Sequence, residues 1–382
     1  MLLVPKERSV THIMKIICSK SNLSAGVNIA LKAIPARTTM PILECIILKV
    51  TNAEIELISN DMEIGIETKV DGMILETGTV ALDAKVFSEI VRKLPDADVE
   101  ITVDENYRVS ISCEKAHFNL LGRSAEEFPG LPAVEKDRQI VLSQFTLKEL
   151  IRQTVFSISD NESNRIMSGE LFEISGDSLR VVSLDGHRIS IRRTQLKNEY
   201  PDAKVIVPGK TLSEISKILS GEADKDVVIS FTGKHILFEM EDTLVVSRLI
   251  EGDYYKIDQM LSSDYETKMT VNKRELLSCI DRASLLIRES EKKPIILTIQ
   301  PTGLELKINT MIGSMKEDID IEMEGRDIMI GFNPKFLMDA LRVIDDETVD
   351  IYLFNPKAPC FIKDKDETYI YLILPVNISA AN

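Results

Sequence analysis

The local cluster in this 382-residue sequence that most suggests covalent chemistry is Leu184-Asp185-Gly186-His187-Arg188. A histidine close to an aspartate could form a general-base pair of the kind that activates a nucleophile. No nucleophile motif accompanies the pair, and Asp-Gly between two apolar runs first predicts a tight turn. An enzyme that uses His187 and Asp185 is therefore the minor alternative, and we predict no catalytic residue.

Other sequence signals of catalysis are also absent. The P-loop, GxGxxG, HExxH and GxSxG patterns do not occur. The histidines and cysteines lack metal-ligand spacing and CxxC pairs, so we predict neither a metal nor a cofactor. Five scattered cysteines indicate reduced, buried thiols in a cytosolic protein: Cys18, Cys45, Cys113, Cys279 and Cys360.

Basic residues, in contrast, recur at a fixed spacing of 125 residues. One series occupies the first turn of three similar segments, and a second series follows seven residues later, so both lie on one side of a helix. Glu89, Glu214 and Asp339 share that side, which is what a plain solvated face would show. Because the cationic pattern occurs three times, we predict that an anion approaches all three helices. The two series are Lys85, Lys210 and Lys335, and Arg92, Lys217 and Arg342.

The segments that position these cations are amphipathic helices at residues 83–94, 208–219 and 333–344. Each repeats apolar or small residues at i, i+3, i+4 and i+7, as one buried stripe requires. Asp83 and Asn333 are favourable N-cap residues, and Pro334 suits a first helical turn.

A second helix precedes each of these, at about residues 22–33, 146–156 and 273–287. Its exposed face is again partly basic, with Lys148, Arg152 and Lys273 among the members. Apolar runs separated by turn residues predict strands between and after the helices. The fold class is therefore α+β, with three tandem domains that each place two helices on an antiparallel sheet. We assign residues 1–13 to an N-terminal extension and the domains to residues 14–137, 138–262 and 263–382.

Composition limits how such a protein could bind a polyanion. With 46 basic and 61 acidic residues, the net charge is −15, which argues against polyanion binding over the whole surface. Contact with nucleic acid must then come from a locally basic face. No apolar run approaches the ~18 residues needed to cross a bilayer, so no membrane contact is predicted. Three units joined head to tail either close into a ring or continue as a filament.

Over residues 14–378 the sequence resembles the bacterial DNA polymerase III β subunits, the sliding clamps. The resemblance rests on the three repeats and on the joint order of RTTMPIL (37–43), LDGHRI (184–189), VIVPGK (205–210) and LILPV (372–376). It implies a non-catalytic, cytoplasmic processivity factor that forms a head-to-tail homodimeric ring around double-stranded DNA. Implied partners are the replicative DNA polymerase catalytic subunit, the clamp loader and other proteins with a clamp-binding motif.

The resemblance also assigns sites. Arg37 and Lys210 match DNA-contacting positions, whereas the remaining cations named above are inferred from helix geometry. Phe118, Leu285 and Leu286 match the dimer contact. A peptide-binding pocket that receives leucine or phenylalanine anchors is implied at Met167, Leu184, Gly186, His187, Arg188, Ile189, Tyr255, Met260, Leu374, Pro375 and Val376.

Three positions depart from the family pattern near this pocket. Tyr255 and Gln259 stand where proline and arginine are usual, and Asn377 replaces an arginine. The peptide preference is therefore expected to differ. The alternatives are an enzyme acting on DNA or a phosphorylated substrate, and a monomeric peptide-binding scaffold without DNA. The threefold basic pattern argues against the scaffold.

Overall fold

A computed structural model describes residues 12–161, 164–261, 264–288 and 293–378. Contacts divide the chain into two compact units. The first unit holds residues 1–141, 217–220 and 224–248, and the second holds residues 142–216, 221–223 and 249–382. The predicted extension at residues 1–13 lies outside the described residues except for its last two positions, which begin β1.

The first repeat contains nine strands and two helices. They are β1 (His12–Ser19), α1 (Lys20–Ala30), β2 (Cys45–Val50), β3 (Ile55–Asn60), β4 (Ile64–Lys69), β5 (Met73–Glu76), β6 (Gly78–Asp83), α2 (Ala84–Lys93), β7 (Asp98–Asp104), β8 (Arg108–Cys113) and β9 (Ala116–Leu121). Short 3-10 turns follow α1 and precede β2, at Leu31–Ala33 and Pro41–Glu44.

The second and third repeats are built alike. The second contains β10 (Gln139–Ser143), α3 (Gln144–Arg152), β11 (Gly169–Leu184), β12 (Arg188–Pro208), α4 (Gly209–Ile218), β13 (Asp226–Phe231), β14 (His235–Met240) and β15 (Thr243–Arg248). The third contains β16 (Thr267–Asn272), α5 (Lys273–Ser284), β17 (Ile295–Gln300), β18 (Gly303–Thr310), β19 (Gly313–Ile319), β20 (Ile321–Gly325), β21 (Ile328–Phe332), α6 (Pro334–Val343), β22 (Thr348–Leu353), β23 (Cys360–Lys363) and β24 (Tyr369–Ile373).

The helices begin where cap residues start them. Asp83 accepts a hydrogen bond from the N–H of Val86 at 2.8 Å, and Asn333 accepts one from Lys335 at 3.0 Å, as predicted. The helices α1 and α3 start two residues earlier than predicted. Ser19 and Ser143 cap them through the N–H groups three residues on, and the apolar pattern alone did not reveal these caps.

Four antiparallel sheets follow from this order, and two of them cross repeat boundaries. Their strand orders are β5-β1-β7-β8-β9, β10-β13-β14-β15-β4-β3-β2-β6, β11-β12-β24-β23-β22-β16-β20 and β19-β18-β17-β21. In the second sheet the last strand of repeat two pairs with β4 of repeat one. In the third sheet the last strand of repeat three pairs with β12 of repeat two.

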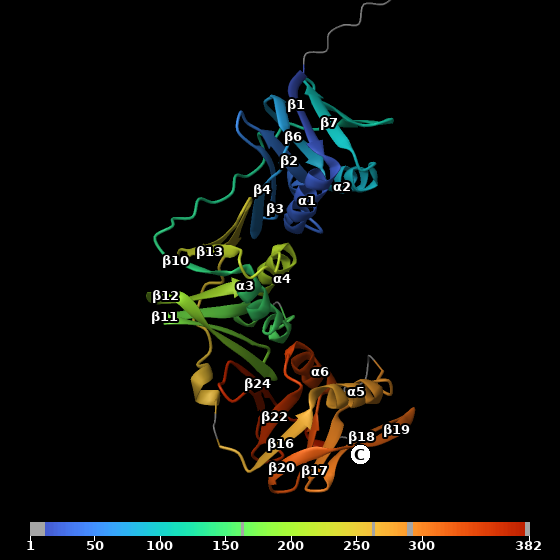
Figure 1. Cartoon of the computed structure of the whole chain (residues 1–382), viewed down its shortest axis with the longest axis vertical. Coiled ribbons are helices and arrows are strands. Elements are labelled where there is room, and N and C mark those ends of the chain that lie inside the picture. The colour runs from blue at the N-terminus through green and yellow to red at the C-terminus, as the bar shows by residue number, and fades with distance from the viewer. Residues whose placement is uncertain (1–11, 162–163, 262–263, 289–292, 379–382) are drawn as a thin grey trace, which may run out of the picture. The chain divides into compact units, whose positions relative to one another are not determined.

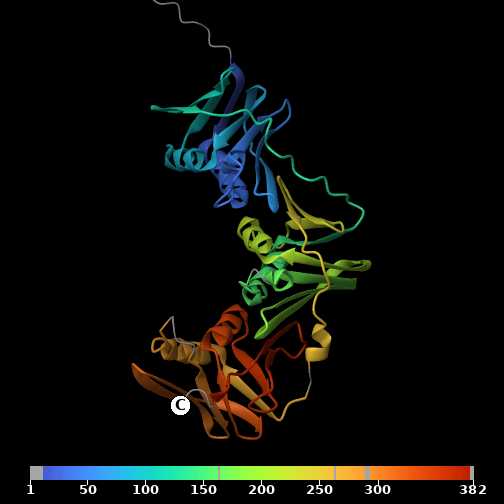
Figure 2. The ribbon, with the colours of Figure 1, turned by 180° about the vertical axis from the view of Figure 1, so that it is seen from behind.

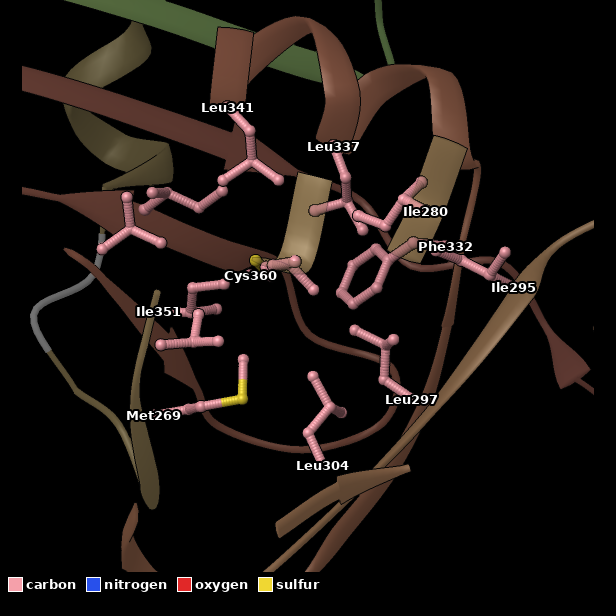
Figure 3. Close-up of a cluster of buried hydrophobic side chains, with 14 of the residues drawn as sticks. Met269, Ile280, Ile295, Leu297, Leu304, Phe332, Leu337, Leu341, Ile351 and Cys360 are labelled. Carbon is pink, nitrogen blue, oxygen red and sulfur yellow. The ribbon is translucent and has the colours of Figure 1, made fainter. Parts of the chain in front are cut away.

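Paired helices pack over the sheets within each unit. The helices α1 and α2 contact each other in the first unit, and α5 and α6 do so in the second (Figure 1). The reverse view shows the same α5–α6 pair beside the strands of repeat three (Figure 2). The apolar stripe of α6, with Leu337 and Leu341, enters a core that also contains Phe332, Ile351 and Cys360 (Figure 3). Among the described residues, no helix combines the length and apolarity needed to cross a membrane.

Candidate functional site

The cations of α2 and α6 point away from the buried stripes of their helices. Phe87 and Val91 bury the inner face of α2, whereas Lys85 and Arg92 are exposed. Arg92 forms an ion pair with Glu89 one turn earlier, and its side chain remains 69% exposed. Exposed ion pairs of this kind contribute little to stability. The cations therefore remain available to a polyanion.

The same arrangement holds for α6 and α4. Lys335 is exposed, and Arg342 is 55% exposed with a long contact to Asp281 at 3.8 Å. Lys210 and Lys217 are exposed on α4, and Arg37 is exposed in the loop before the 3-10 turn at Pro41–Glu44. Lys148 is half-buried on α3.

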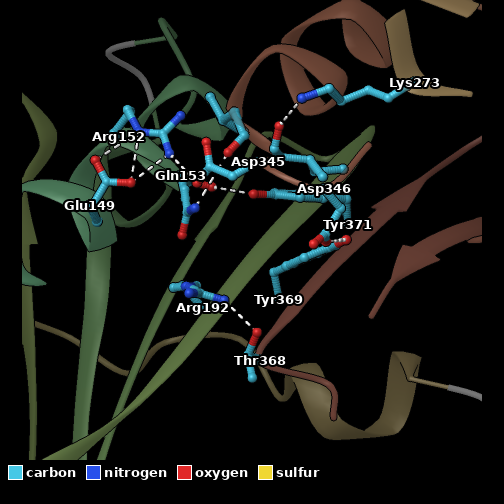
Figure 4. Close-up of polar contacts among 12 residues, drawn as sticks. Glu149, Arg152, Gln153, Arg192, Lys273, Asp345, Asp346, Thr368, Tyr369 and Tyr371 are labelled. Atoms are coloured by element: carbon cyan, nitrogen blue, oxygen red, sulfur yellow. Dashed lines mark hydrogen bonds and ion pairs between the residues drawn. The ribbon is translucent and has the colours of Figure 1, made fainter. Parts of the chain in front are cut away.

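Two of the predicted cations bind acceptors just beyond the end of α6, and one of them, Arg152, thereby joins repeat two to repeat three (Figure 4). Arg152 binds Glu149 on its own helix and Asp345 beyond the end of α6, with an Nη2–Oδ2 distance of 2.8 Å. Lys273 donates to the carbonyl of Ile344 at 2.6 Å. Both side chains thus join elements of the second unit. Helix periodicity placed them on a polar face but did not reveal these acceptors.

The residues predicted to bind a peptide gather around one apolar cluster in the second unit. Its buried floor includes Leu184, Ile189 and Leu372, with Met167 packed at its edge. The term "peptide surface" denotes this floor together with the half-buried Pro375 and the exposed residues Gly186, His187, Tyr255, Met260, Leu374 and Val376. A backbone hydrogen bond from Leu374 to His187 at 2.9 Å joins two sides of the surface, and a second from Val376 to Gly331 at 2.8 Å ties its edge to β21.

Large apolar side chains line the open side of the peptide surface. Met260 is 49% exposed, and Tyr255, Leu374 and Val376 are 36–37% exposed. The Tyr255 hydroxyl accepts a hydrogen bond from Asn164 at 2.9 Å, which orients the ring. Exposed apolar side chains above a buried apolar floor suit the anchors of a short extended peptide.

Arg188 has a different role from the other members of this set. Its side chain is 6% exposed and its guanidinium binds Asp185 (2.9 Å), Asp339 on α6 (2.7 Å) and the carbonyl of Phe156 (2.6 Å). The guanidinium also lies 4.5 Å from the ring centroid of Phe336. Arg188 therefore positions the surface by joining the β11–β12 turn to α6.

Phe336 on α6 borders the peptide surface beside His187, and the sequence pattern did not identify it. Its ring stacks on His187 with centroids 6.1 Å apart, and the side chain also packs against the apolar core of repeat three. The available signal was an aromatic residue beside Lys335, outside the i, i+3, i+4, i+7 series.

The same contacts exclude a catalytic pair at His187 and Asp185. One Asp185 carboxylate oxygen accepts the backbone N–H groups of His187 and Arg188, and the other binds the Arg188 guanidinium. The carboxylate is thus occupied by the turn, and the imidazole stacks on Phe336. The arrangement orients a loop and does not activate a base.

A buried carboxyl lies behind the peptide surface, on β11. Glu170 is fully buried, and burial raises the pKa of its carboxyl to about 8. The Thr154 hydroxyl is 2.6 Å from the carbonyl of Leu150 and 3.1 Å from Glu170 Oε2. A threonine hydroxyl has one hydrogen, and the shorter contact uses it for the carbonyl. Glu170 must then carry the proton that joins it to Thr154.

Two of the three predicted dimer residues, Phe118 and Leu285, are exposed apolar side chains, one in each unit. In the first unit, Phe118 on β9 borders an apolar hollow lined by Val86 and Ile90 of α2. In the second unit, Leu285 caps α5 and is 79% exposed, whereas Leu286 packs on the core.

Family models match nearly the whole chain. They are the N-terminal domain of the DNA polymerase III beta subunit at residues 14–132, the central domain at 141–256 and the C-terminal domain at 258–377. A beta sliding clamp from Staphylococcus epidermidis is 37% identical over 360 residues, covering 91% of this chain and 95% of the relative.

Solved structures agree with the family models. A structure from Eubacterium rectale assigned to the DNA polymerase III beta subunits is 65% identical, with a TM-score of 0.92 and coverage of 96% and 100%. The DNA polymerase sliding clamp of Bacillus subtilis is 36% identical, with the same TM-score and coverage.

Proposed function

The chain belongs to the DNA polymerase III β subunit family, the β sliding clamps, and on that premise we propose that two copies form a ring that encircles duplex DNA. The ring is a non-catalytic processivity factor in the cytoplasm. It tethers the replicative polymerase and other partners that carry a clamp-binding motif. The repeats at residues 14–137, 138–262 and 263–382 are its domains. A clamp loader opens it, because the chain has no nucleotide-binding motif of its own.

The observation that carries this proposal is a strand junction that occurs twice within the chain. In the first unit, β15 pairs antiparallel with β4, with Ser247 opposite Ile64. In the second unit, β24 pairs antiparallel with β12, with Ile373 opposite Arg188. Each junction thus joins the last strand of one repeat to the strand after the β-turn of the preceding repeat.

The two halves of a third junction remain at sheet edges. The last strand of repeat one, β9, ends the first sheet, and β19 ends the fourth sheet. Unpaired edges of this kind are templates for pairing with another chain. If β9 of each copy pairs with β19 of the other, all six repeats close into a ring through two equivalent head-to-tail contacts.

The repeated geometry predicts the register of this third junction. Ser314 on β19 is equivalent to Ile189 on β12, because each is the residue of its strand that pairs across the preceding turn, with Asn309 and Leu184 respectively. Asn119 on β9 is equivalent to Leu372 on β24, which pairs with Ile189. Asn119 of one copy is therefore expected opposite Ser314 of the other. Phe118 then occupies the position of Tyr371, whose ring packs near Phe156 beyond the end of α3. The equivalent place beyond α5 is Leu285 and Leu286.

Solution mass and directed cross-linking test the dimer. Light scattering coupled to gel filtration should give twice the 42.9 kDa chain mass. The variant Asn119→Cys/Ser314→Cys should oxidise to a covalent dimer, because directly opposed Cα atoms lie about 4.5–5.5 Å apart. All five native cysteines are buried, so they should not form disulfides between copies in this assay.

The matched control shifts one cysteine by two residues. Asn119→Cys/Lys316→Cys keeps the same face of the strand but separates the pair diagonally by about 7–8 Å. It should cross-link poorly. A strict monomer, or equal cross-linking by both variants, contradicts the proposed closure.

DNA contact rests on the repeated cations. Phosphate contacts by lysine and arginine do not depend on sequence, so they suit a ring that slides. Reversing charge at Lys85, Lys210 and Lys335 should weaken loading on circular DNA and leave the dimer mass unchanged. A control that reverses exposed lysines elsewhere in the three repeats, Lys115, Lys234 and Lys357, should load normally. Equal loading by the two triple variants would remove the helix cations from the proposed site.

A further inference from the structure

A second cleft lies beside the β3–β4 turn in the first unit. Its volume is about 230 Å³, and its lining includes Asn60, Met62, Glu63, Pro129, His235 and Arg248. Such a volume is below the usual range for drug-sized ligands and suits one or two side chains of a peptide. The cleft is separate from the residues of the peptide surface, all of which belong to the second unit.

The turn beside this cleft has the same backbone construction as the turn at the peptide surface. Asp61 accepts the N–H groups of Glu63 and Ile64, as Asp185 accepts those of His187 and Arg188. Met62 has φ of 74° where Gly186 has φ of 89°. A left-handed conformation is unfavourable for methionine, so the chain retains this turn at some cost.

The flanking contacts repeat as well. The Ser59 hydroxyl donates to Ala30 O at 2.6 Å, and the Ser183 hydroxyl donates to Thr154 O at the same distance. Arg248 donates its backbone N–H to Glu63 as Leu374 donates to His187. The cleft is thus the counterpart of the peptide surface at the preceding strand junction.

The side chains at equivalent positions differ in polarity. Arg248 occupies the place of Leu374, and Asn60 occupies the place of Leu184. The half-buried His235 stands opposite Arg248 on the neighbouring strand, and burial together with Arg248 and Lys234 lowers the pKa of its imidazole. Within the described ranges, neither the Arg248 guanidinium nor the His235 ring has an acidic partner, and no ion pair joins Arg248 to Glu63.

The linker after repeat one closes the other side of the cleft. Asn60 donates its side-chain N–H to Pro129 O at 3.3 Å, which holds the linker against the turn. Leu131 lies so close to Gly65 that a Cβ there would meet its Cδ2 at 2.3 Å. The wall with Pro129 and Pro132 is therefore a fixed apolar face opposite the two basic side chains.

We propose that this cleft is a second docking site, which takes an extended acidic peptide of a protein partner with a carboxylate between Arg248 and His235. The inference rests on the proposed role of the peptide surface as its apolar counterpart. Charge complementarity selects the occupant: the Arg248 guanidinium, which has no acidic partner among the described residues, attracts a carboxylate, and the neutral His235 ring can donate a hydrogen bond to it. Met62 and the proline wall would contact its aliphatic portions.

Methyl resonances of methionine report on both sites in one experiment. Met62 is 48% exposed at the cleft, and Met260 is 49% exposed at the peptide surface. The full chain, labelled with ¹³C-methyl methionine, is titrated with acetyl-Ala-Glu-Ala-Asp-Ala-amide and separately with acetyl-Ser-Leu-Ser-Leu-Phe-amide. Met62→Leu and Met260→Leu variants assign the two signals. We expect the acidic peptide to shift Met62 and the apolar peptide to shift Met260.

Single-charge variants test the assignment. Arg248→Gln should weaken the acidic peptide about tenfold, since a hydrogen bond to a charged group is lost, and should leave the Met260 response intact. Lys234→Gln removes the same charge from an exposed neighbour outside the cleft lining and should bind normally. His235→Phe removes the ring N–H donor while keeping an aromatic ring, and it should also weaken binding of the acidic peptide.

Four results would overturn the proposal: an unmoved Met62, equal weakening by Lys234→Gln and Arg248→Gln, a Met62 shift caused equally by the apolar peptide, or a shift caused by oligothymidylate but not by the acidic peptide. The last would assign the cleft to phosphate. Failure of the apolar peptide to move Met260 would instead count against the peptide surface alone, so the two proposals fail separately.

Discussion

Glu170 makes the stability of the second unit depend on pH, in a direction that its surroundings determine. Tyr254 does not supply a hydrogen bond to it, because the one phenol hydrogen is donated to the carbonyl of Val182 at 3.1 Å. Glu170 Oε1 has no hydrogen-bond partner among the described atoms. Burial raises the pKa of the folded carboxyl from 4.5 to about 8. An ionised carboxylate at this position is therefore unfavourable.

The sign and size of the effect follow from proton linkage. Between pH 4.5 and about 8 the folded state holds a proton that the unfolded state has lost. The free energy of unfolding then falls as pH rises, by about 1.4 kcal/mol per pH unit. Over the whole window the loss is on the order of 5 kcal/mol, and above it the dependence ends.

Glu170→Gln removes the ionisation and retains a donor to Thr154. Urea unfolding followed by circular dichroism, with hydrogen exchange of β11 as a local reading, measures wild type and variant across the pH window. The difference between them should grow as pH rises, with the variant relatively more stable at alkaline pH. A constant offset is expected from the amide hydrogen that lacks an acceptor.

The exposed Glu251→Gln is the matched control, because it removes one carboxylate from solvent without changing a buried contact. It should follow wild type at every pH. If the difference between wild type and Glu170→Gln does not change with pH, Glu170 is ionised in the folded protein. The single-hydrogen argument at Thr154 would then be refuted.

Three further predictions concern contacts between elements. Asp339→Ala removes one carboxylate partner from the buried guanidinium of Arg188, so the free energy of unfolding of the second unit, measured in urea, should fall by about 3 kcal/mol. A decrease below about 1 kcal/mol would show that water replaces the carboxylate. Leu374→Ala with Val376→Ala should reduce polymerase binding, measured by surface plasmon resonance, while DNA retention is unchanged; equal losses would indicate a folding defect. Phe118→Asp should shift the light-scattering mass toward the monomer, since a charge enters the apolar contact, and an unchanged mass would remove Phe118 from the interface.

Much of each repeat was predictable because its determinants are local. Apolar periodicity and caps such as Asp83 and Asn333 depend on residues within one or two turns. The α+β fold class, the helix pairs and the antiparallel sheets follow from these signals, and the structure confirms them. The caps at Ser19 and Ser143 were also present in the sequence, but they were not recognised there.

The pairing of strands across repeats could not be predicted in the same way. The contact of Thr68 with Thr243 spans 175 residues, and the strand pattern does not say which edge meets which. Arg188 and Arg152 show the related difficulty for side chains. Both were predicted to bind ligands, yet their acceptors, Asp339 and Asp345, come from the next repeat. A cation on a polar face is read as exposed until its partner is known.

The strand junctions have similar hydrogen bonds, but they differ in whether the two paired strands are covalently connected. At the β15–β4 and β24–β12 junctions, the two repeats belong to one chain and are connected by a polypeptide linker. Their strands therefore remain neighbours at any protein concentration. The junction between copies has no such connection and must offset the lost translational freedom, about 4–15 kcal/mol, from its contacts alone. The closed assembly therefore has two separable joints, each of about five residue pairs if it matches β4 with β15. Dilution, or a clamp loader that acts on one joint, can therefore separate that joint and let DNA enter without unfolding any repeat.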